Sequence, residues 1–312
     1  MPFARRGPCW PFILAVAFAM AACDSPTEPP PDPGSEFDFS RDLIAFESER
    51  NGVTDIYLVT TDGSDLINIT DNPAVDGDAA WSPDGSKLAF ASTRDGNTEV
   101  YVMDVDGSNV TRLTNDPAVD RFPAWSPDGS TLAFSSNRDG NLDVYLMDAD
   151  GSNVRRITDH EASDVEPVWM PDGSRIIFCS TRSAWPGNSD IWSMNPDGTG
   201  LVNLTNEPSS FDCAPGIAPD PTASGARISF VSDRAAGDLS IYTMDADGSG
   251  VWRVTTDPAA EFDSSPSSDG ALLAFDSDRS GSWDIYTVEV SGTNLRRLTT
   301  DETDEWNPAW RP

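Results

Sequence analysis

The sequence is poor in the residue types on which most enzymatic and nucleic-acid-binding sites depend. Its 312 residues include one histidine, and 20 lysines and arginines stand against 52 aspartates and glutamates, a formal net charge of −32. Proteins that bind nucleic acids or anionic membrane surfaces use clustered basic side chains, so this charge argues against both. A serine hydrolase needs a histidine base, and no G-x-S-x-G, H-E-x-x-H or C-x-x-C motif is present. We therefore expect a protein that is not an enzyme.

The chain also lacks any stretch with convincing helical periodicity, although its composition is that of a folded protein. Hydrophobic residues make up 38% of it, with 10 tryptophans and 14 phenylalanines, whereas disordered acidic chains are usually poor in aromatic residues. Glycine and proline, with 23 and 25 residues, indicate many tight turns. These features favour short strands joined by turns.

Residues 1–22 have the order of an export signal. Arg5 and Arg6 form a short basic start, residues 10–20 are mostly apolar, and small residues directly precede Cys23. An apolar run of this length is too short to span a bilayer and is typical of a secretory signal peptide. The residues before Cys23 resemble the lipobox of bacterial lipoproteins, with Met20 in the place of the usual leucine. In that family the cysteine carries the lipid after cleavage.

Residues 23–38 are expected to link an anchor to a folded domain. The segment DSPTEPPPDPGSE is rich in proline and acidic residues and has no apolar periodicity, which is typical of a semi-extended spacer. Such a spacer suits a lipid on Cys23, and ordinary secretion with cleavage near Ala21 is the alternative. We expect an exported protein, lipid-anchored in the bacterial cell envelope, either periplasmic or at the outer surface.

The remaining sequence, residues 39–312, is a tandem repeat. The motif AWSPDGS occurs at 80–86 and again at 124–130, and VWMPDGS follows at 168–174. Each unit continues with an apolar segment that ends in arginine, a second apolar segment, and a short segment that ends in threonine. Asp-Gly pairs between the segments supply the positive φ angles of tight hairpins, so each unit holds four short strands. A repeat of about 44 residues with four strands predicts the blade of a β-propeller.

Six copies of the repeat predict an all-β, six-bladed propeller with four antiparallel strands per blade. The first copy, from about Phe39, lacks its innermost strand, and the final segment WNPAWRP is such a strand without the rest of a blade. We therefore expect the C-terminal strand to complete the first blade and close the ring, since closure removes unpaired edges.

The repeats resemble those of the TolB-type propeller family over residues 39–312. The resemblance implies a non-enzymatic protein whose propeller is a scaffold for other envelope proteins. We expect the protein to be monomeric. The separate N-terminal domain of TolB has no counterpart here. A binding module for an extracellular glycan or small ligand is the alternative, and it predicts a pocket lined with non-repeated aromatic residues near the channel.

One arginine and one aspartate recur in every unit, on the face that carries the loops between the second and third strands. Because function rarely needs the same residue in every repeat, we predict structural Arg–carboxylate ion pairs. The arginines are Arg50, Arg94, Arg138, Arg182, Arg234 and Arg279, and the aspartates are Asp76, Asp120, Asp164, Asp212, Asp263 and Asp304. A further acidic residue opens the third strand of each unit except the fifth, where Ser240 takes its place.

The fourth and fifth units depart from the repeat, so a specific binding edge is expected there. They contain insertions together with Trp185, Phe211 and Trp252. Cys179 and Cys213 also lie in these neighbouring units, and exported proteins favour disulfides, so the two cysteines either pair or remain buried thiols.

Calcium is the one cofactor that the sequence leaves open. Turns such as 104–107 and 148–151 resemble the start of a calcium loop but lack its third ligand and its distal glutamate. Hairpin turns with exposed acids are the favoured interpretation. The acids around the channel mouth are a second candidate for a calcium site.

Overall fold

The computed structural model describes residues 37–182, 188–219, 225–235 and 238–312. Strands, turns and loops account for all of these residues, so no helix in the described ranges could cross a membrane. The predicted signal, Cys23 and most of the predicted linker lie outside the described residues. The folded unit runs from Phe37 to Pro312.

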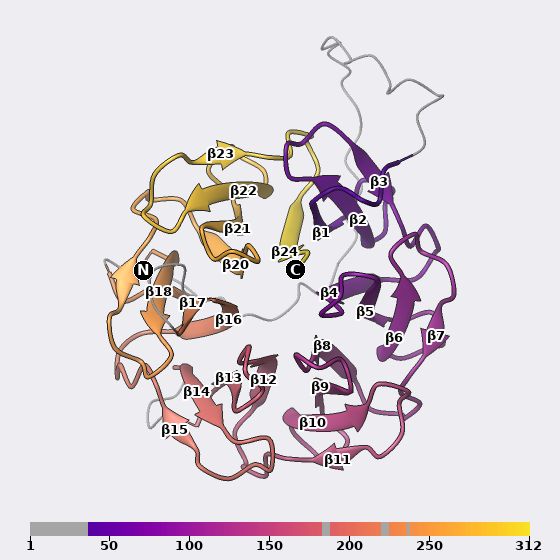
Figure 1. The fold of residues 1–312 in the computed structure, drawn as a ribbon, viewed down its shortest axis with the longest axis vertical. Helices are drawn as coiled ribbons and strands as arrows, with labels where there is room; N and C mark the ends of the chain where they lie inside the picture. Colours follow the sequence, from indigo (N-terminus) through magenta and orange to yellow (C-terminus); the bar gives the residue numbers. More distant parts are fainter. Residues whose placement is uncertain (1–36, 183–187, 220–224, 236–237) are drawn as a thin grey trace, which may run out of the picture. The chain divides into compact units, whose positions relative to one another are not determined.

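In the described ranges, 24 strands form six antiparallel sheets of four strands each, arranged as a ring (Figure 1). Blade 1 contains β24 (Glu305–Trp310), β1 (Leu43–Ser48), β2 (Asp55–Thr60) and β3 (Leu66–Asn68). Blade 2 contains β4 (Asp76–Trp81), β5 (Lys87–Ser92), β6 (Glu99–Asp104) and β7 (Thr111–Arg112). Blade 3 contains β8 (Asp120–Trp125), β9 (Thr131–Ser136), β10 (Asp143–Asp148) and β11 (Arg155–Arg156).

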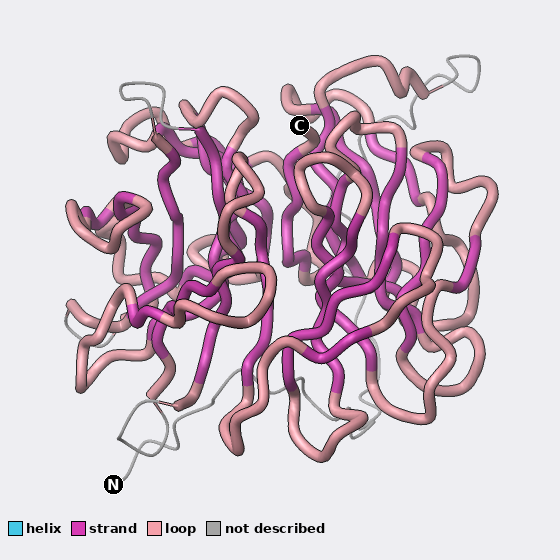
Figure 2. Tube along the Cα trace, turned by 60° about the horizontal axis from the view of Figure 1, so that its bottom comes forward, coloured by secondary structure: helices cyan, strands magenta, loops and turns pink. Residues whose placement is uncertain are grey.

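The other three blades repeat this order from the innermost to the outermost strand. Blade 4 contains β12 (Asp164–Trp169), β13 (Ile176–Ser180), β14 (Asp190–Met194) and β15 (Val202–Asn203). Blade 5 contains β16 (Asp212–Pro219), β17 (Ala226–Ser232), β18 (Ser240–Asp245) and β19 (Trp252–Arg253). Blade 6 contains β20 (Glu261–Pro266), β21 (Leu272–Ser277), β22 (Asp284–Glu289) and β23 (Arg296–Arg297). The predicted six-bladed propeller is confirmed, and Figure 2 shows the strands stacked around the ring axis.

The ring is closed by the C-terminal strand, as predicted. β24 pairs antiparallel with β1, so blade 1 is built from both ends of the domain. The closure is also fixed to blade 2, because the indole nitrogen of Trp81 donates to the carbonyl of Ala309 at 2.9 Å. Arg311 donates to the carbonyl of Gly85 at 2.9 Å and lies over the Trp81 ring.

The core of the propeller repeats with the blades. The second strand of each blade carries a fully buried phenylalanine, such as Phe134 in blade 3, and this ring packs against an aromatic residue of the third strand in most blades. Of the tryptophans predicted to pack between blades, Trp81 is buried, and Trp125, Trp169 and Trp310 are half-buried against neighbouring hydrophobic clusters.

The turn between the third and fourth strands explains the recurrent Asp-Gly pair. Gly107 has a φ of 79°, and a Cβ atom on it would lie 2.4 Å from the carbonyl oxygen of Ile69 in the preceding blade. Gly151 stands in the same relation to Leu113. Only glycine combines this left-handed conformation with such close packing between blades.

Candidate functional site

Each repeated arginine is held in a cluster that we call the Arg clamp. In blade 3, Arg138 forms an ion pair of 2.8 Å with Asp120, and its Nε donates to the hydroxyl of Ser136 at 2.9 Å. Its guanidinium lies 5.4 Å and 4.9 Å from the ring centres of Phe134 and Tyr145. The carboxylate is fully buried, so the clamp ties the innermost strand to the loop after the second strand. This geometry is that of a structural brace rather than a ligand site.

Four of the six predicted pairs are present, and the partners in the other two blades are corrected. Asp76, Asp120, Asp164 and Asp212 pair with the arginines of their own blades. Arg279, however, pairs with Glu261 instead of Asp263, and Arg50 pairs with Glu305 instead of Asp304.

Both arginines pair with the acid at one fixed position along the innermost strand. The clamp acid is the first residue of the innermost strand, and in β20 and β24 that residue is a glutamate. Asp304 precedes its strand, is exposed and accepts a hydrogen bond from the Trp283 amide at 3.0 Å. Asp263 lies two residues into its strand, where it takes part in a different site.

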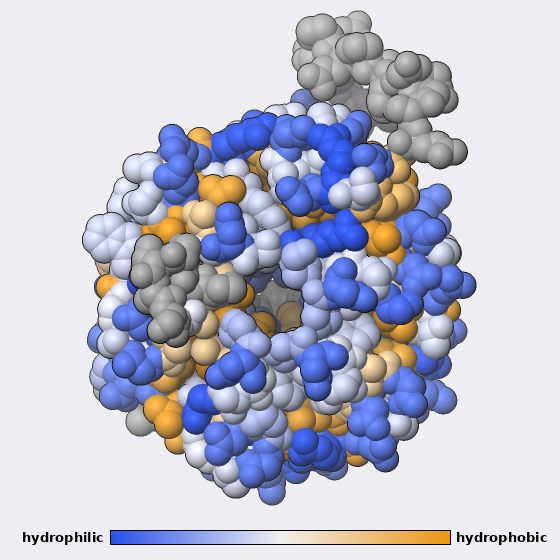
Figure 3. All heavy atoms as spheres, in the orientation of Figure 1, coloured by the Kyte–Doolittle hydropathy of each residue, from blue (hydrophilic) through white to orange (hydrophobic). Residues whose placement is uncertain are grey.

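That site is formed by β-bulges of the innermost strands. The register of each of these strands shifts after its second residue, and the third residue has a positive φ. We call these the bulge residues: Asp78, Phe122, Glu166, Ala214, Asp263 and Asn307. Bulges re-aim a side chain out of the regular strand alternation. The innermost strands surround the ring axis, which is hollow in Figure 3.

The acidic bulge residues come from alternate blades and interact across this channel. Asp78, Glu166 and Asp263 belong to blades 2, 4 and 6, and the charges of Glu166 and Asp78 both act on Asp263. Glu47 of β1 and Asp276 of β21 add two more carboxyl groups. Together these five residues are called the channel acids.

Glu47 and Asp276 occupy the same position in the second strand of their blades. Each accepts a hydrogen bond from the amide of a bulge residue in the next blade. Glu47 accepts hydrogen bonds from the Asp78 amide at 2.7 Å, the Asn307 side chain at 2.6 Å and the Trp306 indole at 2.8 Å. Asp276, which is 2% exposed, accepts a hydrogen bond from the Asn307 amide at 3.3 Å.

Burial makes the channel acids hard to ionise. It raises the pKa of Glu47 to about 8, with a further contribution from the charge of Asp78. It raises the pKa of Glu166 to about 7, and burial together with the charges of Glu166 and Asp78 raises the pKa of Asp263 to about 7. Burial and the nearby Asp263 also raise the pKa of Asp276 well above its ordinary value. The channel therefore carries more carboxyl groups than its surroundings neutralise.

One basic side chain acts on this group. Arg121 of β8 forms an ion pair of 3.2 Å with Asp78, and its guanidinium lies 3.8 Å from the ring centre of Phe122. Its charge also lowers the pKa values of Glu166 and Asp263. Five carboxyl groups are thus set against one guanidinium among the described residues of the channel, an arrangement that attracts positive charge.

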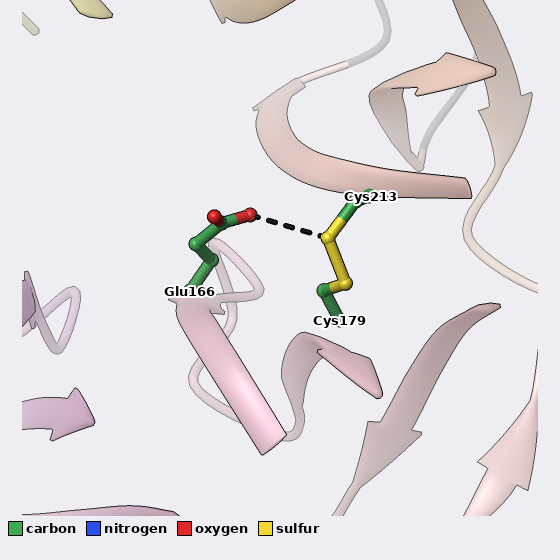
Figure 4. A group of neighbouring side chains, drawn as sticks. All are labelled: Glu166, Cys179 and Cys213. Carbon is green, nitrogen blue, oxygen red and sulfur yellow. Dashed lines mark hydrogen bonds between the residues drawn. A yellow bond between two sulfur atoms is a disulfide. The ribbon is translucent and has the colours of Figure 1, made fainter. Parts of the chain in front are cut away.

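The wall beside Glu166 contains a disulfide between Cys179 and Cys213, which joins blade 4 to blade 5 (Figure 4). The Glu166 carboxylate accepts a hydrogen bond from the Ala214 amide at 3.0 Å, and it lies 3.5 Å from the Cys213 sulfur. The carboxylate and the two sulfurs lie within 4.8 Å of one another, as in a metal site. Because the sulfurs are bonded to each other, they are not thiolate ligands in this state. Of the two predicted alternatives for these cysteines, the structure has the bonded pair.

Comparison with known families identifies this ring. The sequence pattern of the TolB beta propeller domain family matches residues 36–120 and 209–312, more than half of the chain. The chain belongs to this family. The pattern of the Tricorn protease N-terminal beta propeller domain matches the intervening residues 103–211. No curated protein matches the sequence.

Solved structures show the same fold at low sequence identity. TolB from Acinetobacter baumannii is 22% identical with a TM-score of 0.75, over 90% of this chain and 69% of that protein. The putative TolB from Agrobacterium tumefaciens is 22% identical with a TM-score of 0.66, over 87% and 99% of the two chains. An oligogalacturonate lyase from Vibrio parahaemolyticus is 15% identical with a TM-score of 0.57, over 85% and 76%. At these identities the likeness extends to the fold alone.

The remaining sequence candidates lie away from the channel acids. Asp106, in one of the turns compared with a calcium loop, accepts a hydrogen bond from the Ser108 amide of its own hairpin, and Asp104 pairs with Lys87. His160 is exposed and accepts a hydrogen bond from the Ala162 amide at 3.0 Å. Of the aromatic residues expected at a binding edge, Trp252 is 56% exposed, whereas Trp185 lies outside the described residues.

Acids around the channel mouth were predicted as a candidate calcium site, but of the channel acids only Asp263 was named, and for another role. No residue type is common to all six bulge positions, so these positions do not stand out as a repeated motif. The signal that could have found them is the third residue of each innermost strand, where an acidic residue stands in every second blade.

Proposed function

We propose that this TolB-family propeller is a non-enzymatic interaction scaffold, anchored in the cell envelope through a lipid on Cys23. Membership of the TolB propeller family supports the scaffold. The observation that carries the proposal is the surplus of carboxyl groups in the channel, which suits a partner segment that presents lysine or arginine side chains.

The channel acids would recognise such a segment through charge. A cation that enters the channel favours the ionised forms of Glu166 and Asp263, which burial alone disfavours. Binding therefore releases protons, and it should be strongest where these acids can ionise at low cost. Charge complementarity of this kind raises specificity and association rate more than it raises affinity.

The experiment compares capture by two matched triple variants of the mature domain. In the channel variant, Asp78→Asn, Glu166→Gln and Asp263→Asn remove three bulge carboxylates. In the hairpin variant, Asp106→Asn, Asp150→Asn and Asp247→Asn remove three exposed carboxylates that accept hydrogen bonds in surface turns. A protein captured from envelope extract by the wild type and the hairpin variant, but not by the channel variant, supports the proposal. Capture of the same proteins by all three contradicts it.

The anchor is tested separately. Full-length protein should enter the detergent phase on Triton X-114 partition, and Cys23→Ser should move it to the aqueous phase. Partition of both proteins into the aqueous phase would favour ordinary secretion.

The second candidate function is a binding module for a glycan or small ligand that uses calcium. Calcium prefers carboxylate oxygens, and the channel acids supply five such groups, with Phe122 as the aromatic member of the bulge ring. Calcium should then raise the unfolding temperature of the wild type and of the hairpin variant but not that of the channel variant.

A further inference from the structure

Outside the channel, each blade has a second polar cluster, at the cross-strand pair between its third and fourth strands. In blade 3 this pair is Tyr145 and Arg156. Arg156 forms ion pairs with Asp143 at 2.7 Å and Asp159 at 3.1 Å, and the Tyr145 hydroxyl donates to Asp139. Carboxylates of the same blade therefore neutralise the guanidinium and accept a hydrogen bond from the phenol, although the buried Nε of Arg156 has no hydrogen-bond partner among the described residues.

Blades 1, 2, 4 and 6 keep the central carboxylate of this cluster. In blades 2 and 6, Arg112 pairs with Glu99 at 2.6 Å and Arg297 pairs with Asp284 at 2.7 Å. In blades 1 and 4 the fourth strand offers an asparagine instead of an arginine. Asn68 donates to Asp55 and Asn203 to Asp190, both at 2.9 Å.

Blade 5 keeps the tyrosine and the arginine but has lost the acids. Tyr242 and Arg253 are the cross-strand pair, and Ala235, Ser240 and Thr256 stand where blade 3 has Asp139, Asp143 and Asp159. The half-buried Arg253 donates to the Ser240 hydroxyl at 2.8 Å, and no carboxylate of the described residues lies within 4.0 Å of it.

The Tyr242 hydroxyl lacks the acceptor that its counterpart in blade 3 has. Tyr242 is 4% exposed, and the Ala235 amide acts on its oxygen, but its proton has no acceptor among the described residues. The buried Nε of Arg253 is also without a partner there, as the Nε of Arg156 is in blade 3. A buried donor without an acceptor costs stability, and a half-buried guanidinium without a carboxylate adds to that cost. Burial also raises the pKa of Tyr242, so its hydroxyl stays protonated and can donate.

The surrounding charges do not supply the missing acceptor. Arg234 stacks over the Tyr242 ring at 5.3 Å, but it is neutralised by Asp212 in its own Arg clamp at 2.8 Å. In blades 2 and 3 the threonine after the fourth strand donates a hydrogen bond to the acid that opens the third strand. Its counterpart in blade 5, Thr255, donates to Glu261 of blade 6 instead. One net positive charge therefore remains at the pair in an otherwise acidic protein.

We propose that Arg253, Tyr242 and Ser240 form a binding site for a carboxylate group supplied by another molecule. The carboxylate takes the place that the Asp143 side chain has in blade 3. Arg253 donates to it from its guanidinium, as arginine commonly does to carboxylates, and the two hydroxyls donate from the side. The source is either a free organic acid or an acidic residue of a bound protein, and the site is separate from the channel acids.

The test is titration of the mature domain with ¹³C-labelled acetate, followed by NMR and by thermal unfolding, with sodium chloride at equal ionic strength as control. Acetate should bind saturably and raise the unfolding temperature of the wild type, whereas chloride should not. Arg253→Gln should weaken binding by about tenfold or more, because a hydrogen bond to a charged group is lost. Tyr242→Phe should weaken it by a smaller factor, and it serves as the second variant if Arg253→Gln does not fold.

Ser240→Asp is the sharpest variant, because it restores the carboxylate that the other blades have. It should unfold at a higher temperature than the wild type without acetate and should no longer respond to acetate. Arg297→Gln, the matched change in blade 6, should leave acetate binding unchanged.

Two results would overturn the proposal. One is a wild type that shows no saturable response to acetate while Ser240→Asp is still stabilised, since blade 5 would then simply have lost an ion pair. The other is an acetate response that survives in Arg253→Gln and Tyr242→Phe. A capped peptide with one internal glutamate distinguishes the sources: tighter binding than acetate indicates an acidic residue of a protein, and weaker binding indicates a free acid.

Discussion

The clamp acids and the bulge residues lie on the same six innermost strands, two residues apart, but only the clamp position carries an acid in every blade. The first residue of each strand is always an acid that pairs with an arginine, whereas the third residue differs from blade to blade. An acid that recurs in all blades forms the same stabilising ion pair in each of them. A residue that varies while the backbone bulge is kept can serve recognition without weakening the ring.

The largest expected effect comes from breaking one Arg clamp. Arg138→Ala leaves the fully buried Asp120 carboxylate without its counter-charge, which should cost about 3 kcal/mol or more in the free energy of unfolding. Thermal unfolding and denaturant titration measure this loss. Partner capture by the folded fraction should not change.

The matched control is Arg155→Ala. Arg155 is exposed and donates to the carbonyl of Pro196, so its removal should cost about 0.5 kcal/mol or less. If the two alanine variants unfolded at the same temperature, the clamp would not be the brace that its geometry indicates.

The next effect concerns the disulfide that joins blades 4 and 5. The Cys179–Cys213 bond closes a sequence separation of 34 residues, so its loss should cost about 2–4 kcal/mol. Reduction with a phosphine should lower the unfolding temperature of the wild type and leave that of the Cys179→Ser, Cys213→Ser double variant unchanged. A wild type that is insensitive to reduction would contradict a stabilising bond.

A smaller effect is the pH dependence of stability. Burial raises the pKa values of Glu166 and Asp263 in the folded state, so the folded protein binds more protons than the unfolded chain between about pH 4 and pH 7. The stability from these groups is complete at the acid end and is lost as the pH rises through the folded-state values. The unfolding temperature should therefore be higher near pH 6 than near pH 8, by a few degrees at about 2–4 °C per kcal/mol.

The channel variant should flatten this dependence, because its amides do not titrate. Part of the slope should remain, since burial also raises the pKa values of the clamp acids Glu261 and Glu305 to about 7. An unchanged slope would mean that the channel carboxyl groups are as well solvated as those of an unfolded chain.

The last comparison separates the two acids at the start of β24, of which only Glu305 belongs to an Arg clamp. Glu305→Gln removes a buried ion-pair partner of Arg50 and should destabilise the ring measurably. Asp304→Asn changes an exposed cap on the Trp283 amide and should cost about 0.5 kcal/mol or less in urea unfolding. A larger loss of stability in Asp304→Asn than in Glu305→Gln would favour the pairing of Arg50 with Asp304 that the sequence pattern predicted.

The sequence predicted the blades, their number and the closing strand because each rests on a local pattern that occurs several times. The Arg clamps were predicted in four blades and misplaced in two, since Asp263 and Asp304 resemble the pattern more closely than Glu261 and Glu305 do. The choice depends on strand register, and register becomes visible only once the bulges are known. The channel acids could not be predicted from local patterns, because they are separated in sequence and come together only when the blades close around the axis.

The measurement that tests the central claim most directly is the affinity of the captured partner for the wild type, the channel variant and the hairpin variant. Both variants lose three carboxylates, so they differ in the place of the charge and not in its amount. Recognition in the channel predicts binding about tenfold weaker or more for the channel variant and little change for the hairpin variant. Equal affinities for the two variants would contradict a recognition site in the channel.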